Sequence, residues 1–167
     1  MQKIVPLFEI APSPASGLSL SRFHLLQNQP FILTGTTHGQ VLIHSLKNPQ
    51  SPEITFKLDR QVVCSDFISK SLKIILGDFQ GNILLIDLMK NNQQVFKKTD
   101  RNLTCFRGFN TNPNLFYSGS LQGVTLHDTR QRNSSIHLQQ QQRNVLSLDL
   151  SLNDDHLLSC SNSNIIF

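Results

Sequence analysis

The sequence contains few of the residues on which many functional sites depend. Its 167 residues include no tryptophan, one tyrosine and three cysteines, and only 16% of them are charged. Cys64, Cys105 and Cys160 are odd in number and lack the CxxC spacing of zinc sites, so neither a disulfide framework nor a metal site is indicated. We expect no metal and no cofactor, and we expect reduced thiols in a cytoplasmic or nuclear protein.

Long apolar runs are also missing. No stretch approaches the roughly 18 consecutive apolar residues that a membrane helix needs. The apolar run from Ile4 to Ile10 is interrupted by Pro6 and Glu9, and only Lys3 precedes it. A secretory signal is therefore not predicted, and no membrane partner is expected.

The motifs of catalysis are absent as well. The sequence contains no nucleophile elbow, phosphate-binding loop, metal-binding helix or pair of catalytic acids, so we predict that the chain is not an enzyme. Its formal charge is +4 and its pI is about 9.2, but the basic residues are scattered along the chain. Nucleic-acid binding is permitted by this charge and is not indicated by it.

The strongest positive signal is an internal repeat. Gly39, Gly81 and Gly123 follow one another at intervals of 42 residues. Each glycine closes a small or polar turn between two apolar strands, which predicts a β-hairpin with a positive φ at the glycine. The three copies of this hairpin, and the start of a fourth, are residues 34–44, 77–87, 118–128 and 157–167.

Further strand patterns flank the hairpins. One precedes each of the later hairpins, at residues 62–67, 103–106 and 145–150, and a weaker one follows each of the first three, at residues 54–58, 95–97 and 135–138. Four short antiparallel strands in about 42 residues, without helical periodicity, are typical of a propeller blade. We predict an all-β fold, a partial β-propeller of four-stranded antiparallel blades with about three and a half blades in this chain.

The repeat also predicts the domain organisation. We expect an N-terminal segment at 1–17, with Ile4–Phe8 as a candidate closing outer strand, then blades at 18–58, 59–98 and 99–138 and a partial blade at 139–167. Propellers usually close with four to eight blades. We therefore expect further sequence or another chain to complete the ring.

The stretch from Ser118 to Arg130 resembles the WD-repeat family. It is similar to that family's serine-glycine-serine turn, acidic-glycine corner and terminal tryptophan-aspartate dipeptide, and the likeness covers about residues 18–167. The dipeptide reads His44-Ser45, Ile86-Asp87 and His127-Asp128 in this chain. Without any tryptophan, the family's hydrogen-bonded tetrad of Asp, His, Ser/Thr and Trp is incomplete, so we expect looser blades. The resemblance implies a non-catalytic scaffold for protein–protein interactions in a multisubunit complex.

Three arginines share one place in the repeat. Arg60, Arg101 and Arg143 each lie two residues before the first strand of a blade. On a propeller, equivalent positions form a ring, and three guanidinium groups on one face could bind the carboxylates or phosphates of a partner protein. The alternative is local pairing, because Asp59 and Asp100 adjoin two of the arginines.

A second candidate site is Asp128 with Arg130. These residues resemble the Asp-x-Arg motif that some WD-repeat proteins present to the adaptor of cullin-4 ubiquitin ligases, with His127 in place of a tryptophan. The resemblance implies, as an alternative function, a substrate receptor of such a ligase, whereas Arg130 could simply cap the strand of its own blade. An RNA-associated propeller is a further alternative, and it would lose affinity steeply with added salt.

Overall fold

The structure is a computed structural model that describes residues 17–26, 29–48, 51–68, 71–90, 92–99, 102–138 and 144–162. Every helix or strand within these ranges is a β-strand, which confirms the all-β prediction. The chain divides into two compact units, Met1–Gln61 and Val62–Phe167. The candidate closing strand Ile4–Phe8 lies outside the described residues.

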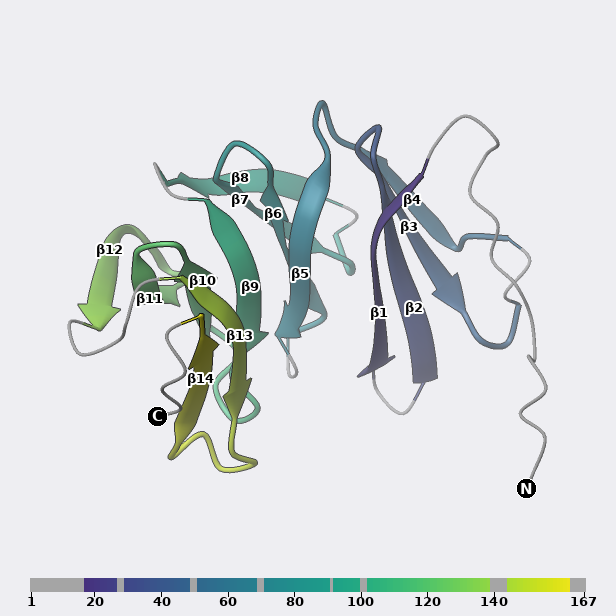
Figure 1. Ribbon diagram of the computed structural model, residues 1–167. Coiled ribbons are helices and arrows are strands. Elements are labelled where there is room, and N and C mark those ends of the chain that lie inside the picture. Colours follow the sequence, from purple (N-terminus) through teal and green to yellow (C-terminus); the bar gives the residue numbers. More distant parts are fainter. Residues whose placement is uncertain are drawn as a thin grey trace, which may run out of the picture. The chain divides into compact units, whose positions relative to one another are not determined.

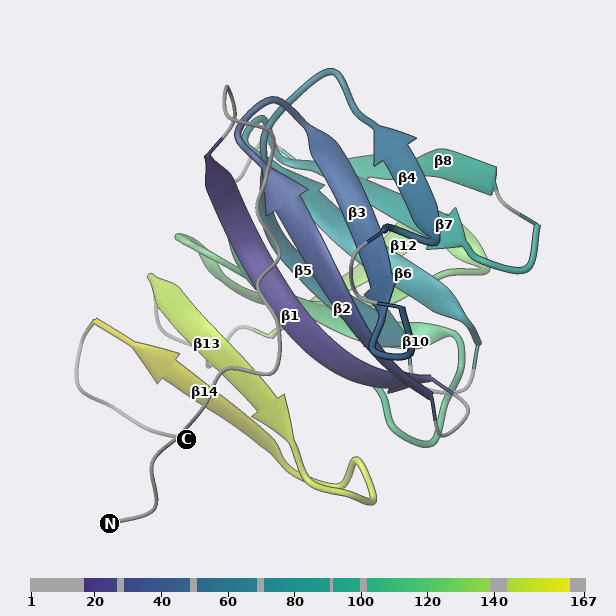
Figure 2. The same cartoon turned by 90° about the vertical axis from the view of Figure 1, so that its right-hand side faces the viewer.

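The first unit holds one antiparallel sheet of four strands in sequential order (Figure 2). Its strands are β1 (Leu18–Leu26), β2 (Gln29–Thr36), β3 (Gln40–Ser45) and β4 (Ile54–Lys57). Leu33, Val41 and Ile43 are fully buried on its two central strands. These branched side chains favour extended backbone, and their burial stabilises the sheet.

The second unit holds two further four-stranded antiparallel sheets and a hairpin. The second sheet consists of β5 (Val62–Ile68), β6 (Lys73–Asp78), β7 (Asn82–Asp87) and β8 (Asn92–Lys98). The third consists of β9 (Leu103–Gly108), β10 (Leu115–Ser120), β11 (Gly123–Asp128) and β12 (Gln131–Leu138), and the hairpin of β13 (Val145–Leu150) and β14 (Leu157–Ser161).

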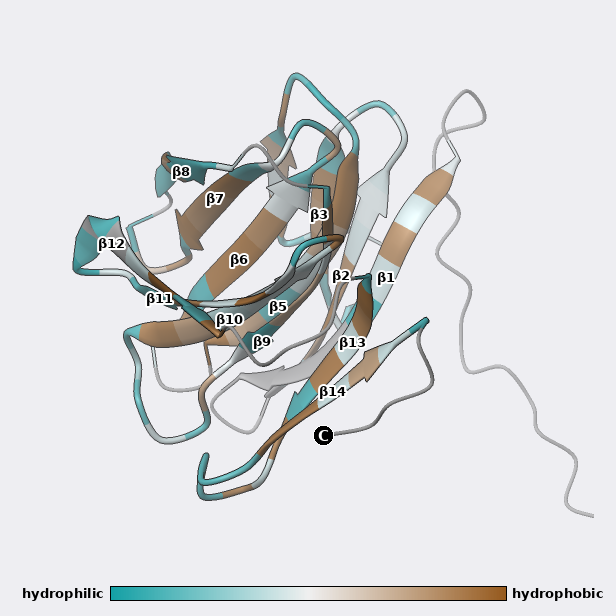
Figure 3. Ribbon diagram, turned by 60° about the vertical axis from the view of Figure 1, so that its left-hand side comes forward, coloured by the Kyte–Doolittle hydropathy of each residue, from teal (hydrophilic) through white to brown (hydrophobic). Residues whose placement is uncertain are grey.

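Within this second unit, the first strands of successive sheets lie side by side (Figure 1). The backbone N–H of Gly108 on β9 donates to the buried Oδ2 of Asp66 on β5 at 2.9 Å, and the Thr104 hydroxyl donates to the Val145 carbonyl on β13 at 2.6 Å. β5, β9 and β13 therefore form the inner side of this unit. β8 and β12 are the mostly exposed outer strands, coloured largely hydrophilic in Figure 3.

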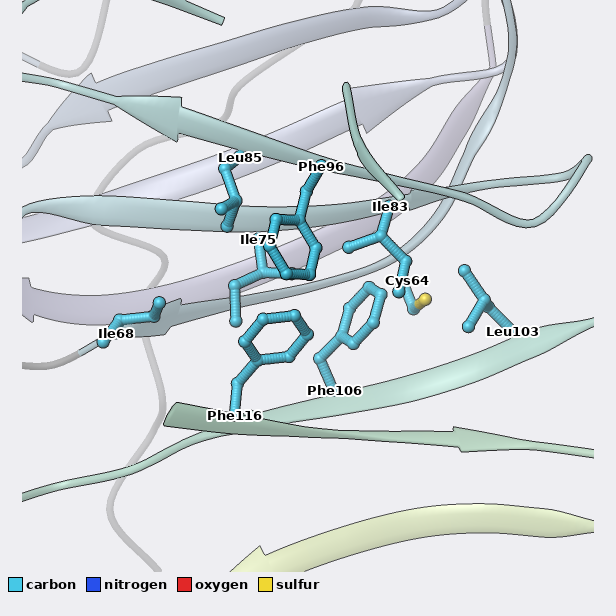
Figure 4. Packing of buried hydrophobic residues seen from close by; sticks show 9 residues of the cluster. All are labelled: Cys64, Ile68, Ile75, Ile83, Leu85, Phe96, Leu103, Phe106 and Phe116. Carbon is cyan, nitrogen blue, oxygen red and sulfur yellow. The ribbon is translucent and has the colours of Figure 1, made fainter. Parts of the chain in front are cut away.

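An apolar cluster fills the space between the second and third sheets (Figure 4). The rings of Phe96 and Phe106 meet the ring of Phe116 edge to face, with centroids 5.8 and 6.0 Å apart. Ile75 and Ile83 close the cluster from the central strands of the second sheet. Because sheet faces are covered on both sides, β6 and β7 are apolar along nearly their whole length, as the repeat predicted.

Two glycines set how closely the sheets of the second unit approach one another. A Cβ on Gly77 would lie 2.9 Å from the Phe106 ring of the third sheet and 2.6 Å from Cys64 Sγ. At Gly119, 42 residues later, it would lie 2.9 Å from Val145 of the hairpin and 2.5 Å from Cys105 Sγ. Neither place has room for a larger residue, since protein interiors are close-packed.

The turn between β13 and β14 is tied to the third sheet by one carboxylate. Asp154 has a φ of 62° and accepts four hydrogen bonds, from the backbone and side-chain N–H groups of Asn110 at 2.9 and 3.0 Å, and from the backbone N–H and hydroxyl of Thr111, both at 2.7 Å. Burial alone would raise the pKa of Asp154, but these hydrogen bonds hold it below its usual value. A salt bridge of 3.1 Å between Arg107 and Asp149 links the same two elements.

The packing at Gly77 yields a stability prediction. Gly77→Ala is expected to lower the free energy of unfolding by about 1–3 kcal/mol, because its methyl group would displace Phe106 and Cys64. Gly17→Ala is the control, since its Cβ would meet only ordinary contacts at 3.5 Å or more. Urea unfolding of both variants measures the difference, and equal stabilities would contradict the packing described.

The four hydrogen bonds to Asp154 yield a second prediction. Asp154→Gly, which keeps the left-handed backbone, should cost about 1–3 kcal/mol at pH 7, whereas Asp155→Gly next to it should cost less. Because the pKa of Asp154 is lowered on folding, its contribution is present above the unfolded value of about 3.9 and is lost as the pH falls through the folded value. Unfolding curves at several pH values test this, and a difference between wild type and Asp154→Gly that persists at pH 2 would contradict it.

Candidate functional site

The second strand of each four-stranded sheet ends in a buried residue that orders the turn after it. In the second sheet this residue is Asp78, whose Oδ1 accepts the backbone N–H groups of Gln80 at 2.9 Å and Asn82 at 2.8 Å. Its Oδ2 accepts the Asn82 side-chain N–H at 2.6 Å. One carboxylate therefore holds the whole β6–β7 turn.

Thr36 and Ser120 take the same place in the first and third sheets, each 42 residues from Asp78. The Thr36 hydroxyl accepts the N–H of Gln40 at 3.1 Å, and the Ser120 hydroxyl accepts the N–H of Gln122 at 3.2 Å. All three residues are at most 5% exposed. Sequence reasoning missed these caps, although their 42-residue spacing was visible, because the residue type differs each time.

The turn glycines adopt the predicted conformation. Gly39, Gly81 and Gly123 have φ values of 82°, 83° and 123°. This confirms the prediction of positive φ, which only glycine adopts without steric cost. The turns therefore have a fixed backbone shape in every sheet of the repeat.

Each turn also bonds to a loop that crosses from one sheet to the next. The carbonyl of Gly81 accepts both the N–H and the hydroxyl of Thr99, at 2.8 and 2.9 Å. In the third sheet, the N–H of Leu121 donates to the Asn102 carbonyl at 3.3 Å, and its carbonyl accepts the N–H of Asn144 at 2.9 Å. The turns and crossing loops of the second unit thus lie on one side, which we call the turn face and define by residues 79–81, 99, 102, 121–122 and 144.

Two apolar side chains project from the turn face. Phe79 is 73% exposed and Leu121 is 42% exposed, and they occupy equivalent places in consecutive repeats. Large apolar side chains held in water on ordered turns are typical of protein-binding surfaces. Sequence reasoning pointed to these turns but did not single out either residue.

The predicted arginines are placed only in part. Arg60 is exposed in the loop between β4 and β5, and its carbonyl lies 2.7 Å from where a Cβ on Gly39 would be. Arg101 and Arg143 lie outside the described residues, although Asn102 and Asn144, which follow them, both bond to Leu121. A ring of three arginines stays a prediction.

The second predicted site lies at the opposite end of the third sheet. Asp128 Oδ1 accepts the backbone N–H of Arg130 at 2.9 Å, and its Oδ2 pairs with the guanidinium at 2.6 Å. The hydrogen bond from the Arg130 side chain lowers the pKa of Asp128 and raises that of Arg130. The Arg130 side chain is 64% exposed.

Asp128 has counterparts that make the same local turn. Asp87 accepts the N–H of Met89 at 3.1 Å, and Ser45 accepts the N–H of Lys47 at 3.2 Å. Capping the turn after the third strand is therefore common to the repeats. Whether Asp128 and Arg130 also contact a ligase adaptor stays a prediction.

His127 occupies the place of the family's tryptophan. It is 1% exposed, its ring stacks on Phe116 with centroids 4.8 Å apart, and its Nε2 and the Ser118 hydroxyl are hydrogen-bonded at 2.8 Å. The predicted departure from the tetrad thus leaves a shorter pair of histidine and serine. Sequence reasoning identified the place of His127 but not its bond to Ser118.

A polar cleft of about 220 Å³ opens beside this pair, between β8 of the second sheet and β10–β12 of the third. We call it the inter-sheet cleft, and its basic and hydroxyl lining includes Lys97, Lys98, Ser118, Ser120, Ser135 and His137.

Metal and membrane features were searched over the described ranges. No three His, Cys, Asp or Glu side chains there are grouped to hold a metal ion. No helix in those ranges is long and apolar enough to span a membrane. Cys64, Cys105 and Cys160 are free thiols, respectively buried, half-buried and exposed.

Comparisons with known proteins support the fold. No family model matches the chain. Dynein axonemal intermediate chain 1 of mouse is 28% identical over 67 residues, which is 39% of this chain and 10% of that protein. The bovine protein is 29% identical over 59 residues, 35% of this chain and 8% of the relative. The match thus spans a tenth or less of these curated relatives.

A solved structure matches most of the chain. The β-propeller domain of Cps50 (Swd1) from Myceliophteria thermophila aligns with a TM-score of 0.65 and 15% sequence identity, covering 81% of this chain and 47% of that domain's chain. Together with the repeated four-stranded sheets, this confirms the predicted fold, a partial β-propeller of the WD-repeat type. The chain spans about half the length of the propeller it matches.

The cap at Asp78 can be tested by amide exchange. Asp78→Ala should speed hydrogen exchange at Gln80 and Asn82 and cost about 1–3 kcal/mol of stability, because buried N–H groups lose a charged acceptor. Asp87→Ala, at the other end of the same sheet, should affect Met89 and Lys90 instead. Unchanged exchange at Gln80 and Asn82 in Asp78→Ala would refute the capping role.

Proposed function

We propose that this chain is a non-catalytic scaffold whose turn face binds a protein partner in a multichain assembly. The observation that carries the proposal is the pair Phe79 and Leu121, exposed at equivalent places on capped turns of adjacent sheets. The curated relatives are named as an intermediate chain of axonemal dynein, that is, one chain of a larger machine. A role in an assembly agrees with that name.

Rigidity of the turn face supports a binding role. The Asp78 and Ser120 caps order the turns that carry Phe79 and Leu121, and backbone hydrogen bonds tie these turns to the crossing loops. A surface ordered before binding loses little conformational entropy when a partner docks. The exposed rings and methyl groups would then supply apolar burial, at about 25 cal/mol for each Å² removed from water.

The opposite end of the second unit also exposes apolar side chains. Met89 is 75% exposed and Leu152 is 87% exposed. They follow different strands, since Met89 lies between β7 and β8 and Leu152 between β13 and β14. They do not repeat at one position as Phe79 and Leu121 do, which makes Met89 a suitable control.

Site-specific photo-crosslinking tests the proposal. A photoreactive phenylalanine at position 79 of the full chain, expressed in its own cells, should give discrete protein adducts, whereas the same residue at position 89 should not. In the chain with the photoreactive residue at position 79, Leu121→Ser should reduce adduct yield several-fold with an unchanged melting temperature, because both side chains are exposed in the free protein.

The other outcomes identify the rival functions. Adducts from position 89 alone, or none from either position, would overturn the turn-face proposal. Adducts with RNA that vanish as salt is raised would favour the nucleic-acid alternative, because phosphate contacts release counterions. Loss of a ligase adaptor on Arg130→Ala, with position 79 silent, would favour the receptor alternative.

A further inference from the structure

The inter-sheet cleft combines basic side chains with hydroxyl groups and is not used by the turn-face proposal. Its charged lining consists of Lys97 and Lys98 at the end of β8, with His137 on β12 opposite. The described residues that line it include no aspartate or glutamate. Its local charge is therefore positive, in a chain whose basic residues are otherwise scattered.

The two lysines are placed across the opening. Lys97 Nζ donates to the Ser135 hydroxyl on β12 at 2.8 Å, so its ammonium group spans from the second sheet to the third. Lys98 is exposed and lies at the last position of β8. An anion in the cleft would meet both ammonium groups, and partial burial would strengthen these contacts relative to open solvent.

Hydroxyl groups form the inner wall of the cleft. Ser118 and Ser120 are both 3% exposed, and Ser118 is bonded to His127. A histidine is smaller than the indole that the WD-repeat pattern has at this place, so space remains between the sheets above His127. The lost tryptophan thus accounts for a cleft in this chain.

The cleft adjoins the turn face. Lys98 pairs in register with Asn82, which directly follows the turn that carries Phe79. Ser120 directly precedes Leu121. A partner segment lying over Phe79 and Leu121 therefore passes the mouth of the cleft.

We propose that the inter-sheet cleft binds the phosphate group of a phosphorylated serine or threonine on the partner protein. This inference rests on the proposed scaffold function, which it extends to the chemistry of the partner. A phosphate group carries about −1.5 to −2 charges at pH 7 and three acceptor oxygens, which suits two ammonium groups and a hydroxyl wall better than a single carboxylate does.

The same geometry argues against a nucleic acid as the occupant. A cleft of about 220 Å³ holds one phosphate group and is not a track along a backbone. Phe96 and Phe116 beside His127 are at most 4% exposed, so they offer no platform on which bases could stack.

Binding to an oriented peptide library tests the inference. The probe is a fluorescent library with a fixed phosphoserine in random flanks, compared with the same library carrying serine, and the full chain is titrated into each. We expect at least tenfold tighter binding of the phosphorylated library. The double variant Lys97→Gln/Lys98→Gln should lose at least tenfold of that affinity.

The matched control removes the same charge elsewhere on the second sheet. Lys73→Gln/Lys90→Gln changes one lysine at the start of β6 and one in the turn after β7, and it should bind the phosphorylated library like wild type. Circular dichroism checks that each variant is folded. Should the Lys97/Lys98 double variant unfold, the exposed Lys98→Gln alone should still weaken binding several-fold.

Each further outcome decides between sources of the phosphate. Equal affinity for the two libraries, or equal loss in the control variant, overturns the inference. Binding of inorganic phosphate as tight as the phosphorylated library, or tighter binding of a single-stranded RNA oligomer, would also overturn it in favour of that ligand. Photo-crosslinks from position 79 without phosphate preference would leave the scaffold function standing, whereas phosphate preference without such crosslinks would contradict the scaffold function alone.

Discussion

The second unit depends on one steric constraint, the contact of side chains from one sheet with a strand glycine of the sheet before it. Phe106 fills the space beside Gly77, and Val145 fills the equivalent space beside Gly119. This contact lets the inner strands β5, β9 and β13 lie side by side while the apolar central strands are covered on both faces. Repetition of the same contact at 42 residues turns a series of hairpin-connected strands into successive blades.

The functional features follow from where that packing is tight and where it is open. Close contact near the inner strands fixes the ends of β6 and β10, so the caps at Asp78 and Ser120 can hold Phe79 and Leu121 in water. Toward the outer strands, His127 in place of an indole fills less of the space between sheets, and a cleft remains there. The rigid face and the adjacent cleft are therefore two consequences of a single blade geometry.

The fold was predictable because its signal is local and repeated. Gly39, Gly81 and Gly123 mark turns that short-range backbone sterics dictate, and the flanking apolar patterns predict the strands. Contacts between residues distant in sequence could not be predicted in the same way. Asp154 bonds to Asn110 through a turn whose residues have no recognisable motif, and the cleft depends on how Lys97 meets Ser135 across two sheets. The candidate arginines were chosen by spacing alone, and of these the described residues include only Arg60.

The most direct test of this account is a measurement of proton distances by nuclear Overhauser spectroscopy in the full chain. The packing predicts cross-peaks from the Gly77 α-protons to the Phe106 ring and from the Gly119 α-protons to the Val145 methyl groups. Cross-peaks from these glycines to Cys64 and Cys105 within their own sheets, without any to Phe106 or Val145, would contradict the stacking of successive sheets.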